Sequence, residues 1–505
     1  MSVIRCAGAL LVTPYRLSIV NHWPTVADSA VSLWIFREPS IIQVSLVGSL
    51  VCIVGMIWEF LMSFVSRFLC VLMTAHCLAG SDVALAEDEW TQFRGPEGQG
   101  HSAAKGLPIS WSETENVVWK TAVPGEGHSS PVISGNQIWL TTAITKELTA
   151  EQEKERLAKL KNSDGLKVVG TLTLQAICIN RETGAIEKTI DLFEVGEPEP
   201  KHSLNSYASP TPVISGDKVF CHFGTYGTAA IDRTSGVVLW RNDKLKIDHQ
   251  NGPGSSPVAW HDRVIIHFDG TDQQFIAALD GATGEVAWQT TRSGKMDETP
   301  ELRKAYGTPL IIPVKGRALV ISPAANWVYA YDAETGSEVW KASYGQLGFS
   351  TVPRPVASGD TVYVATSYMQ SRLVAVRFDG EGDVSETHVT WKADKQIPQK
   401  PSLLLHDDRL YFVSDKGIVR CVNPASGADV WFDRLPGDYS ASPVESEGHL
   451  YFCGENGTCT VLQAGDEFKE LAKNTLDADF MASPAVAGKA LFLRSTTQLY
   501  RIENR

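Results

Sequence analysis

The sequence is poor in positive charge. Its 505 residues include 45 Lys and Arg against 58 Asp and Glu, which gives a net charge of −13. Residues 1–86 hold four Arg and four Asp or Glu, so the whole negative excess falls on residues 87–505. Nucleic acids and anionic membranes bind basic surfaces, so neither is expected as a partner of this acidic chain.

The sequence also lacks the cysteine and kinase motifs that point directly to a chemistry. Its nine Cys include no adjacent pair and no C-x-x-C-H stretch, which excludes c-type haem attachment. H-R-D and D-F-G triplets are absent, which excludes a protein kinase. Beyond residue 86 the Cys are Cys178, Cys221, Cys421, Cys453 and Cys459, in spacings that match no zinc motif. The last two flank the stretch GENGT, where they either pair across a hairpin or remain free thiols.

The beginning of the chain holds two apolar segments. The first, residues 41–65, is nearly continuous and long enough to act as a transmembrane anchor. The second follows Arg67 and ends in the small-residue triplet at 84–86. A positive charge, an apolar stretch and an A-x-A triplet are typical of a secretory signal peptide, which we predict at residues 62–86.

Cleavage of this signal peptide would make Glu87 the first residue of the mature protein. Residues 1–61 are then either an upstream segment translated from an early start codon or an anchor. The signal peptide is the preferred interpretation, so we expect an exported protein without a stable membrane span after cleavage, located in the periplasm or cell envelope.

A short stretch recurs after this leader at intervals of about 50 residues. Three copies are AAIDRTSGVVLW (229–240), AALDGATGEVAW (277–288) and YAYDAETGSEVW (329–340). In each copy, apolar residues lead into an Asp-to-Gly turn, and alternation resumes up to a Trp, which is typical of strand, turn and strand. Repeats of this length without helical periodicity indicate a propeller.

A second pattern precedes each copy. A small residue and Pro open a strand, and a polar turn and another strand follow, as in SSPVISGNQIWL. Each unit therefore contains four strands in a meander, which is the form of a propeller blade. Eight such openings occur, but the last unit, which ends in QLYRIENR, lacks a fourth strand.

We predict that Val117–Thr121 supplies the missing strand by pairing with Leu499–Ile502, because an open ring would leave strand edges exposed. The sequence thus predicts an all-β fold: an eight-bladed propeller of four-stranded antiparallel blades over residues 116–505, preceded by an N-terminal extension at 87–115. The first blade carries an insertion at residues 148–165, which is either a short surface helix with a capping box or a solvated loop.

The repeats resemble the PQQ-like repeat, whose blades end in A-x-D-x-x-T-G-x-x-x-W, over about residues 110–505. That superfamily includes quinoprotein alcohol dehydrogenases, the propeller subunit of the bacterial outer-membrane β-barrel assembly machinery, and sensor domains fused to kinases. The stretch WTQFRGPEGQG (90–100) is similar to the start of a group of secreted bacterial propellers. The resemblance implies a structural role, docking neighbouring blades, for Trp240, Trp288, Trp340, Trp391 and Trp431.

The candidate functional residues precede the first strand of each blade. In a propeller these strands line the central channel, and the loops before them surround one mouth. Turns alone need only Gly, Asn, Asp and Ser, whereas large polar and aromatic residues are frequent here, as in a ligand site. The predicted ligand-binding residues are His128, His202, Asn205, Tyr207, His249, Asn251, Tyr306, Arg354, Lys400, Tyr439 and Met481. No catalytic residue and no metal ligand is predicted.

Three functions are compatible with this pattern. The first is a non-catalytic binding or scaffold protein of the cell envelope, whose mouth binds an envelope protein or a polar or anionic small ligand. The second is a PQQ-dependent dehydrogenase, which needs PQQ and calcium held by carboxylates. The third is a carbohydrate-active, lyase-like propeller, with His249 or Tyr306 as base and Arg354 neutralising a uronate.

The first function is preferred, and no cofactor is expected. The vicinal disulfide and haem motif that help the chemistry of dehydrogenases in this superfamily are absent. The carboxylates near the predicted mouth are few: Glu126, Asp248, Asp438 and Asp479.

Overall fold

The computed structural model describes residues 32–37, 40–45, 89–160, 162–314, 316–346 and 348–505. The chain divides into two compact units, Met1–Ala79 and Gly80–Arg505. In the first unit, strands β1 (Ser32–Arg37) and β2 (Ser40–Ser45) form an antiparallel hairpin. The predicted signal peptide and residues 46–65 of the apolar run lie outside the described residues. Within the described part of the chain, no helix is long and apolar enough to cross a membrane.

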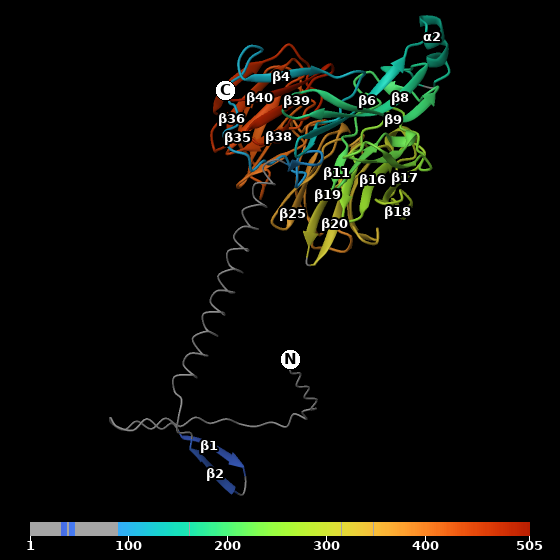
Figure 1. Cartoon of the computed structure of the whole chain (residues 1–505). Coiled ribbons are helices and arrows are strands. Elements are labelled where there is room, and N and C mark those ends of the chain that lie inside the picture. The colour runs from blue at the N-terminus through green and yellow to red at the C-terminus, as the bar shows by residue number, and fades with distance from the viewer. Residues whose placement is uncertain (1–31, 38–39, 46–88, 161, 315, 347) are drawn as a thin grey trace, which may run out of the picture. The chain divides into compact units, whose positions relative to one another are not determined.

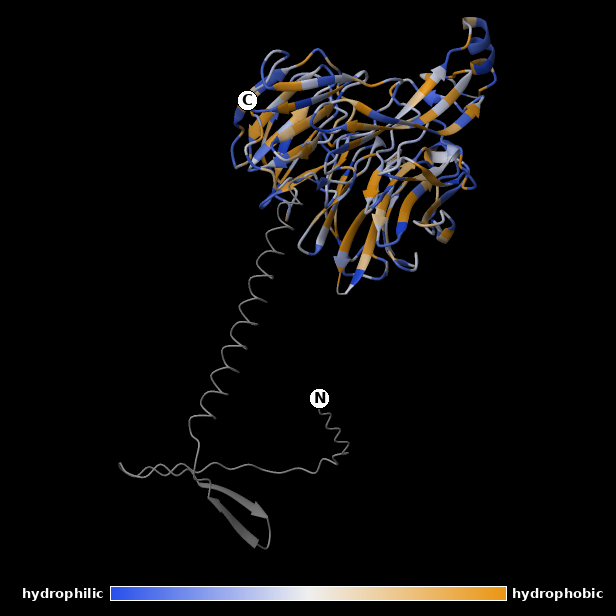
Figure 2. Ribbon diagram, viewed as in Figure 1, coloured by the Kyte–Doolittle hydropathy of each residue, from blue (hydrophilic) through white to orange (hydrophobic). Residues whose placement is uncertain are grey.

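The second unit contains the predicted eight-bladed propeller. Each blade is an antiparallel meander of four strands, and Figure 2 shows hydrophobic residues concentrated along these strands. Blade 1 consists of β5 (Val132–Ser134), β6 (Gln137–Lys146), β8 (Thr171–Asn180) and β9 (Ile186–Gly196), and blade 2 of β11 (Val213–Ser215), β12 (Lys218–His222), β13 (Thr228–Asp232) and β14 (Val238–Asn242). Blade 3 consists of β15 (Val258–Trp260), β16 (Arg263–Asp269), β17 (Gln274–Asp280) and β18 (Val286–Thr291), and blade 4 of β19 (Leu310–Val314), β20 (Arg317–Pro323), β21 (Trp327–Asp332) and β22 (Glu338–Ser343).

Blade 5 consists of β24 (Val356–Ser358), β25 (Thr361–Ala365), β27 (Leu373–Arg377) and β29 (Val389–Ala393), and blade 6 of β30 (Leu404–His406), β31 (Arg409–Val413), β32 (Ile418–Val422) and β33 (Asp429–Arg434). Blade 7 consists of β34 (Val444–Ser446), β35 (His449–Cys453), β36 (Thr458–Gln463) and β37 (Glu470–Thr475), and blade 8 of β38 (Ala485–Ala487), β39 (Ala490–Arg494), β40 (Gln498–Glu503) and β4 (Val117–Ala122). A fifth strand, β28 (Gly382–Asp383), pairs in parallel with the outer edge of blade 4.

The ring closes as predicted from the sequence. β4 pairs antiparallel with β40, with Val117 opposite Ile502 and Thr121 opposite Leu499 (Figure 1). The register shifts between Val117 and Trp119, so a bulge lies within the predicted pairing. An early strand and the last strand therefore form one blade.

The recurrent Trp links six of the eight blades to the next. Trp240 of blade 2 donates its indole N–H to the carbonyl of Gly281 in blade 3 at 3.2 Å. Its ring lies so close to Gly284 that a Cβ there would be 2.5 Å away, and Gly284 has a φ of 75°. Only Gly fits both conditions. Five further indoles, those of Trp119, Trp288, Trp340, Trp391 and Trp431, donate to a carbonyl of the following blade in the same way.

In blades 2, 3 and 4 an Asp builds the turn that presents the Gly. Asp280 Oδ1 accepts from the backbone N–H groups of Ala282 and Thr283 and from the Thr283 hydroxyl. These hydrogen bonds lower the pKa of the Asp280 carboxyl. The residues that recur at this spacing therefore form a turn and a surface on which the Trp docks, rather than a catalytic motif.

Blade 1 is the longest blade. β6, β8 and β9 extend to a helix at their tip, α2 (Ala150–Ala158), which lies within the predicted insertion (Figure 1). Thr149 and Gln152 form the capping box that the sequence suggested. Nearby, β7 (Leu166–Lys167) pairs with β10 (Lys201–His202), which fixes the loop leading into blade 2.

The N-terminal extension enters the central channel. Its first strand, β3 (Glu89–Trp90), pairs with β5, the innermost strand of blade 1. Farther on, Gln99 accepts from the N–H of Ala357 in blade 5, and the Ser102 N–H donates to the Glu445 carbonyl in blade 7. These contacts lie at the ends of the inner strands, next to the tight turns that connect the first and second strand of each blade. The extension therefore fills the end of the channel opposite to the predicted mouth.

Arg354 is bound to this N-terminal extension, whose described residues (89–115) we call the plug. The prediction that Arg354 lies at the mouth is therefore wrong. Its side chain is 2% exposed and donates to the carbonyls of Pro309 and Phe93 and to Gln92 Oε1. Burial lowers the pKa of its guanidinium to about 9. The physical reason is that the Pro309 carbonyl of blade 4 and two oxygens of the extension converge on one position, where a long cationic side chain donates to all three.

We expect the seam between blades 8 and 1 to depend on Trp119. Its ring packs on Gly184 but is only half-buried, so Trp119→Ala should cost about 2–3 kcal/mol, below the roughly 3–5 of a fully buried aromatic residue. Deletion of Leu499–Arg505 should cost more, because β40 pairs on both sides. Urea unfolding measures both effects, with Phe432→Ala, at a 67% exposed site, as the control. Wild-type stability of both seam variants would contradict the closure.

Arg354→Ala should destabilise the protein rather than leave its melting unchanged. The substitution leaves one buried and two part-buried acceptors without their donor, which should cost about 3 kcal/mol or more. The control is Arg409→Ala, because Arg409 pairs with the exposed Asp466 in a surface ion pair. Equal urea midpoints for the two variants would show that the plug does not depend on Arg354.

Candidate functional site

A cavity of about 650 Å³ occupies the predicted mouth of the channel. Seven of the eleven predicted residues line it: His128, His202, Asn205, Asn251, Tyr306, Lys400 and Met481. The loops before the inner strands of blades 1, 2, 3, 4, 6 and 8 supply these side chains. This volume is within the range of small-ligand sites.

A ring of hydroxyl groups forms the floor of the cavity. The N–H of Ser130 donates to the Thr211 hydroxyl at 2.9 Å, and that of Thr211 donates to the Ser256 hydroxyl at 3.0 Å. The same bond links Ser256 to Thr308, Ser402 to Ser442, Ser442 to Ser483 and Ser483 to Ser130. Blade 5 has Arg354 at this position, and its backbone N–H donates to Ser402. Each hydroxyl thus joins two blades and leaves a polar floor.

Sequence reasoning missed this ring, although a signal was present. In six of the blades the residue before the opening Pro is Ser or Thr, at positions 130, 211, 256, 308, 442 and 483. A buried hydroxyl needs a partner, and the neighbouring blade is the nearest source. The same register places Arg354 before Pro355, at the ring and not in the mouth loops.

Three predicted residues are buried beside the cavity instead of lining it. Tyr207 is 0% exposed, and its hydroxyl donates to the Glu199 carbonyl at 2.8 Å. Tyr439 is equally buried and donates to the Pro436 carbonyl. His249 is also buried, and its Nε2 accepts from the Thr225 N–H at 3.0 Å. These side chains hold the mouth loops in place, because their polar atoms need partners inside the protein.

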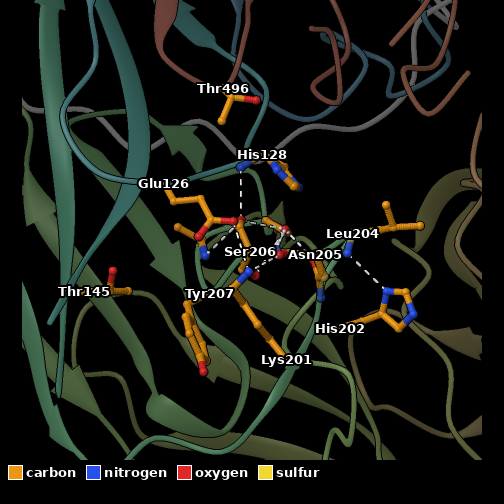
Figure 3. Close-up of polar contacts among 12 residues, drawn as sticks. Glu126, His128, Thr145, Lys201, His202, Leu204, Asn205, Ser206, Tyr207 and Thr496 are labelled. Atoms are coloured by element: carbon orange, nitrogen blue, oxygen red, sulfur yellow. Dashed lines mark hydrogen bonds and ion pairs between the residues drawn. The ribbon is translucent and has the colours of Figure 1, made fainter. Parts of the chain in front are cut away.

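The corner between blades 1 and 2 is a dense polar network (Figure 3). Lys201 pairs with Glu126 at 3.0 Å and donates to the Asn205 carbonyl at 2.7 Å. His202 Nδ1 accepts from the Leu204 N–H at 3.1 Å. Figure 3 also shows the Tyr207 ring turned away from His128 and His202. The network fixes one wall of the mouth.

Both histidines at this corner are neutral at pH 7. Burial, with the charges of Arg494 and Lys201, lowers the pKa of His128 to about 4. Burial also lowers the pKa of His202, and Lys201, Lys304 and Lys400 lower it further. Three lysines therefore act on one imidazole in a protein that is acidic as a whole.

The wall formed by blades 6 and 7 is held by charge pairs. Lys400 lies 2.8 Å from Glu455 and 3.8 Å from Asp415, and Lys416 lies 2.7 Å from Asp438. Burial raises the pKa of Asp415, although Lys400 and the Gln399 N–H oppose the shift. These carboxylates are engaged rather than free.

A disulfide supports the loop that carries Glu455. Cys453 of β35 and Cys459 of β36 lie directly opposite each other and are bonded. Of the two alternatives left open by the sequence, the structure has the paired form. The Gly454 N–H donates to the Thr458 carbonyl at 2.8 Å, so three residues, 455–457, remain in the hairpin loop, which is the loop length that lets the two cysteines face each other.

The lining also includes residues that sequence reasoning did not select, among them Phe93, Leu204, Lys304, Phe349 and Tyr368. Lys304 lies two residues before Tyr306 in the loop RKAYGTP. The sequence therefore indicated this loop as part of the mouth, but it did not indicate Lys304 itself. Phe93 comes from the plug, more than 30 residues before the first blade opening, and no local pattern points to it. Among the described residues, no three His, Cys, Asp or Glu side chains are placed to hold a metal ion.

Comparison with known proteins gives three relatives of limited similarity. The outer membrane protein assembly factor BamB of Burkholderia pseudomallei is 25% identical over 49% of this chain. Tetrathionate hydrolase of Acidithiobacillus ferrooxidans is 21% identical over 67%, and the quinohemoprotein alcohol dehydrogenase ADH-IIG of Pseudomonas putida is 25% identical over 30%. The chain spans 64%, 65% and 21% of their lengths, respectively.

Among solved structures, BamB from Moraxella catarrhalis aligns with 77% of this chain and 97% of its own, with 13% identity and a TM-score of 0.49. A europium-containing methanol dehydrogenase aligns with 82% of this chain and 90% of its own, with 11% identity and a TM-score of 0.46.

The family assignment comes from the repeats themselves. A family model described as "Outer membrane protein assembly factor BamB" matches residues 152–322 and 272–505, which together exceed half of the chain. With its Trp-docked, four-stranded blades, the chain belongs to this family of PQQ-like repeat propellers.

Proposed function

We propose that this protein is a non-catalytic binding or scaffold propeller of the cell envelope, whose mouth cavity holds a polar or anionic small ligand or a segment of an envelope protein. One observation carries the proposal: the mouth has a rigid polar lining in which the ionisable groups mostly hold one another. The carboxylates Asp415 and Asp438 pair with lysines, and His128 and His202 are neutral. Such a lining favours recognition over proton transfer.

An envelope location agrees with this proposal. The leader pattern at residues 62–86 favours export, and the Cys453–Cys459 bond favours an oxidising compartment. The relative from Burkholderia pseudomallei is by name an outer membrane assembly factor. A protein partner is therefore the occupant that these observations favour.

A PQQ-dependent dehydrogenase fits the mouth less well. Calcium bound beside PQQ would need free carboxylates. The four that the sequence indicated near the mouth are engaged: Glu126 with Lys201, Asp248 with the Thr271 hydroxyl, Asp438 with Lys416, and Asp479 with the Thr496 hydroxyl. The cavity carboxylate Asp415 lies 3.8 Å from Lys400. We therefore propose that neither PQQ nor calcium belongs to this site.

The lyase alternative loses the residues assigned to it. Burial lowers the pKa of His249 to about 4, and its Nε2 already accepts a hydrogen bond. The Tyr306 hydroxyl donates to the His249 carbonyl at 2.7 Å, and Arg354 is buried in the plug. None of the three groups is available to a uronate in the mouth.

Site-specific photo-crosslinking in cells tests the binding role. A photoreactive residue at Leu204, on the cavity wall, should capture a discrete partner. The matched control is Val237, at the outer side of blade 2, because both side chains are 58% exposed. Equal capture at the two positions, or capture at Val237 alone, would move the binding surface away from the mouth.

The dehydrogenase alternative has its own assay. After reconstitution with PQQ and calcium, we expect no dye-linked oxidation of alcohols or aldoses, because the mouth carboxylates are already paired. A matched preparation treated with a chelator is the control. Robust turnover that the chelator abolishes would overturn the proposed function and establish the dehydrogenase.

A further inference from the structure

Lys304 is the exception to the charge pairing at the mouth. It is 6% exposed and lines the cavity, and its ammonium contacts Gln250 Oε1. It also lies 5.9 Å from the centroid of the Phe349 ring. Within the described part of the chain Lys304 has no carboxylate within ion-pair distance, whereas Lys201 and Lys416 have one each and Lys400 has two. Asp248 and Glu301 act on it only at longer range. A buried cation without a counter-ion is costly.

The residues that position Lys304 adopt an unfavourable backbone conformation. Gln250 has a φ of 62° and Ser350 a φ of 53°, and both are non-glycine residues in the left-handed region. Gln250 contacts the Lys304 ammonium, and the Ser350 N–H donates to the Lys304 carbonyl at 2.8 Å. Backbone strain of this kind persists where the surrounding structure enforces it, and it is concentrated at ligand sites.

Two further lysines lie in the neighbourhood of Lys304: Lys201, which is paired with Glu126, and Lys400, which is paired with Glu455. Lys304, Lys201 and Lys400 all lower the pKa of His202, so the three ammonium groups lie within electrostatic range of one imidazole. The chain as a whole carries a charge of −13. Because their carboxylate partners neutralise Lys201 and Lys400, Lys304 is the cation of these three that remains to attract an acidic ligand.

The rim above these lysines is apolar and exposed. Leu204 is 58% exposed, and Tyr368 and Met369 are 54% and 56% exposed. The latter two form β26 (Tyr368–Met369), which pairs with β23 (Gly348–Phe349). Exposed apolar groups beside a polar cavity extend the binding surface beyond the cavity itself, which suits a ligand longer than the pocket.

We propose that the mouth docks an extended acidic segment of a partner protein, with a carboxylate on the Lys304 ammonium and an apolar side chain on the rim formed by Leu204 and Tyr368. This inference rests on the proposed binding function and specifies its ligand. A carboxylate supplies the counter-ion that Lys304 lacks, and the neutral His202 does not compete for it. A neighbouring apolar side chain covers the rim and excludes water from the pair.

Fluorescence anisotropy with labelled synthetic peptides tests the proposal on the full-length protein. The probe is a peptide of alternating Leu and Glu, compared with the same peptide carrying Gln in place of Glu. We expect saturable binding that weakens about tenfold or more with Gln, and equally with Lys304→Met, because one charge-assisted bond is lost. Lys218→Met is the matched control, since Lys218 pairs with Asp217 at the tight turn of blade 2 and does not line the cavity, and it should bind as wild type does.

Several results would overturn the inference: equal binding of the Glu and Gln peptides, no binding of either peptide, or preferential binding of oligogalacturonate, an acidic carbohydrate. Thermal melting confirms that Lys304→Met is folded. Crosslinking at Leu204 separates this inference from the function on which it rests. If the crosslink at Leu204 forms equally well in the Lys304→Met variant, the binding role of the mouth stands, but the proposal that the ligand is an acidic segment is refuted.

Discussion

The contact between a Trp of one blade and a Gly of the next is the interaction on which the rest of this propeller depends. The indole donates to a carbonyl and lies flat on a residue without a side chain, and the turn beneath it is held by an Asp. One element therefore fixes both the spacing and the orientation of successive blades. Where Lys188 replaces Trp in blade 1, its aliphatic stem packs on Gly236 in the same manner. The outer strand of blade 7, β37, also lacks a Trp, so two of the eight junctions form without this indole contact.

This repeated geometry directs eight equivalent loops towards one axis, and their differences make the mouth. The hydroxyl ring beneath them is uniform except at Arg354, which binds the N-terminal extension. The same position at the start of the inner strand thus carries a hydroxyl of the cavity floor in seven blades, and in blade 5 it carries the Arg354 that binds the N-terminal extension. Phe93 of the extension reaches the cavity, so the plug at one end of the channel also contributes to the site at the other.

The sequence was sufficient to predict features that arise from neighbouring residues. The blades, the strand at Val117–Ala122 and the capping box at Thr149 follow from local periodicity and turn chemistry. The burial of Arg354 does not, because its acceptor Gln92 lies 262 residues away. Tyr207 and His249 precede inner strands as expected, yet their loops fold inward to satisfy carbonyl and N–H groups. Polar side chains in a loop therefore indicate where a site lies, but not which of them face it.

Binding of a partner through the mouth of the propeller is most directly tested by hydrogen–deuterium exchange of the purified protein with and without solubilised envelope extract. A partner at the mouth should slow exchange in the mouth loops, including residues 199–207, 248–254 and 302–308, and leave exchange in the outer strands β14 and β18 unchanged. Protection confined to outer strands, or the absence of any protection, would contradict binding at the mouth.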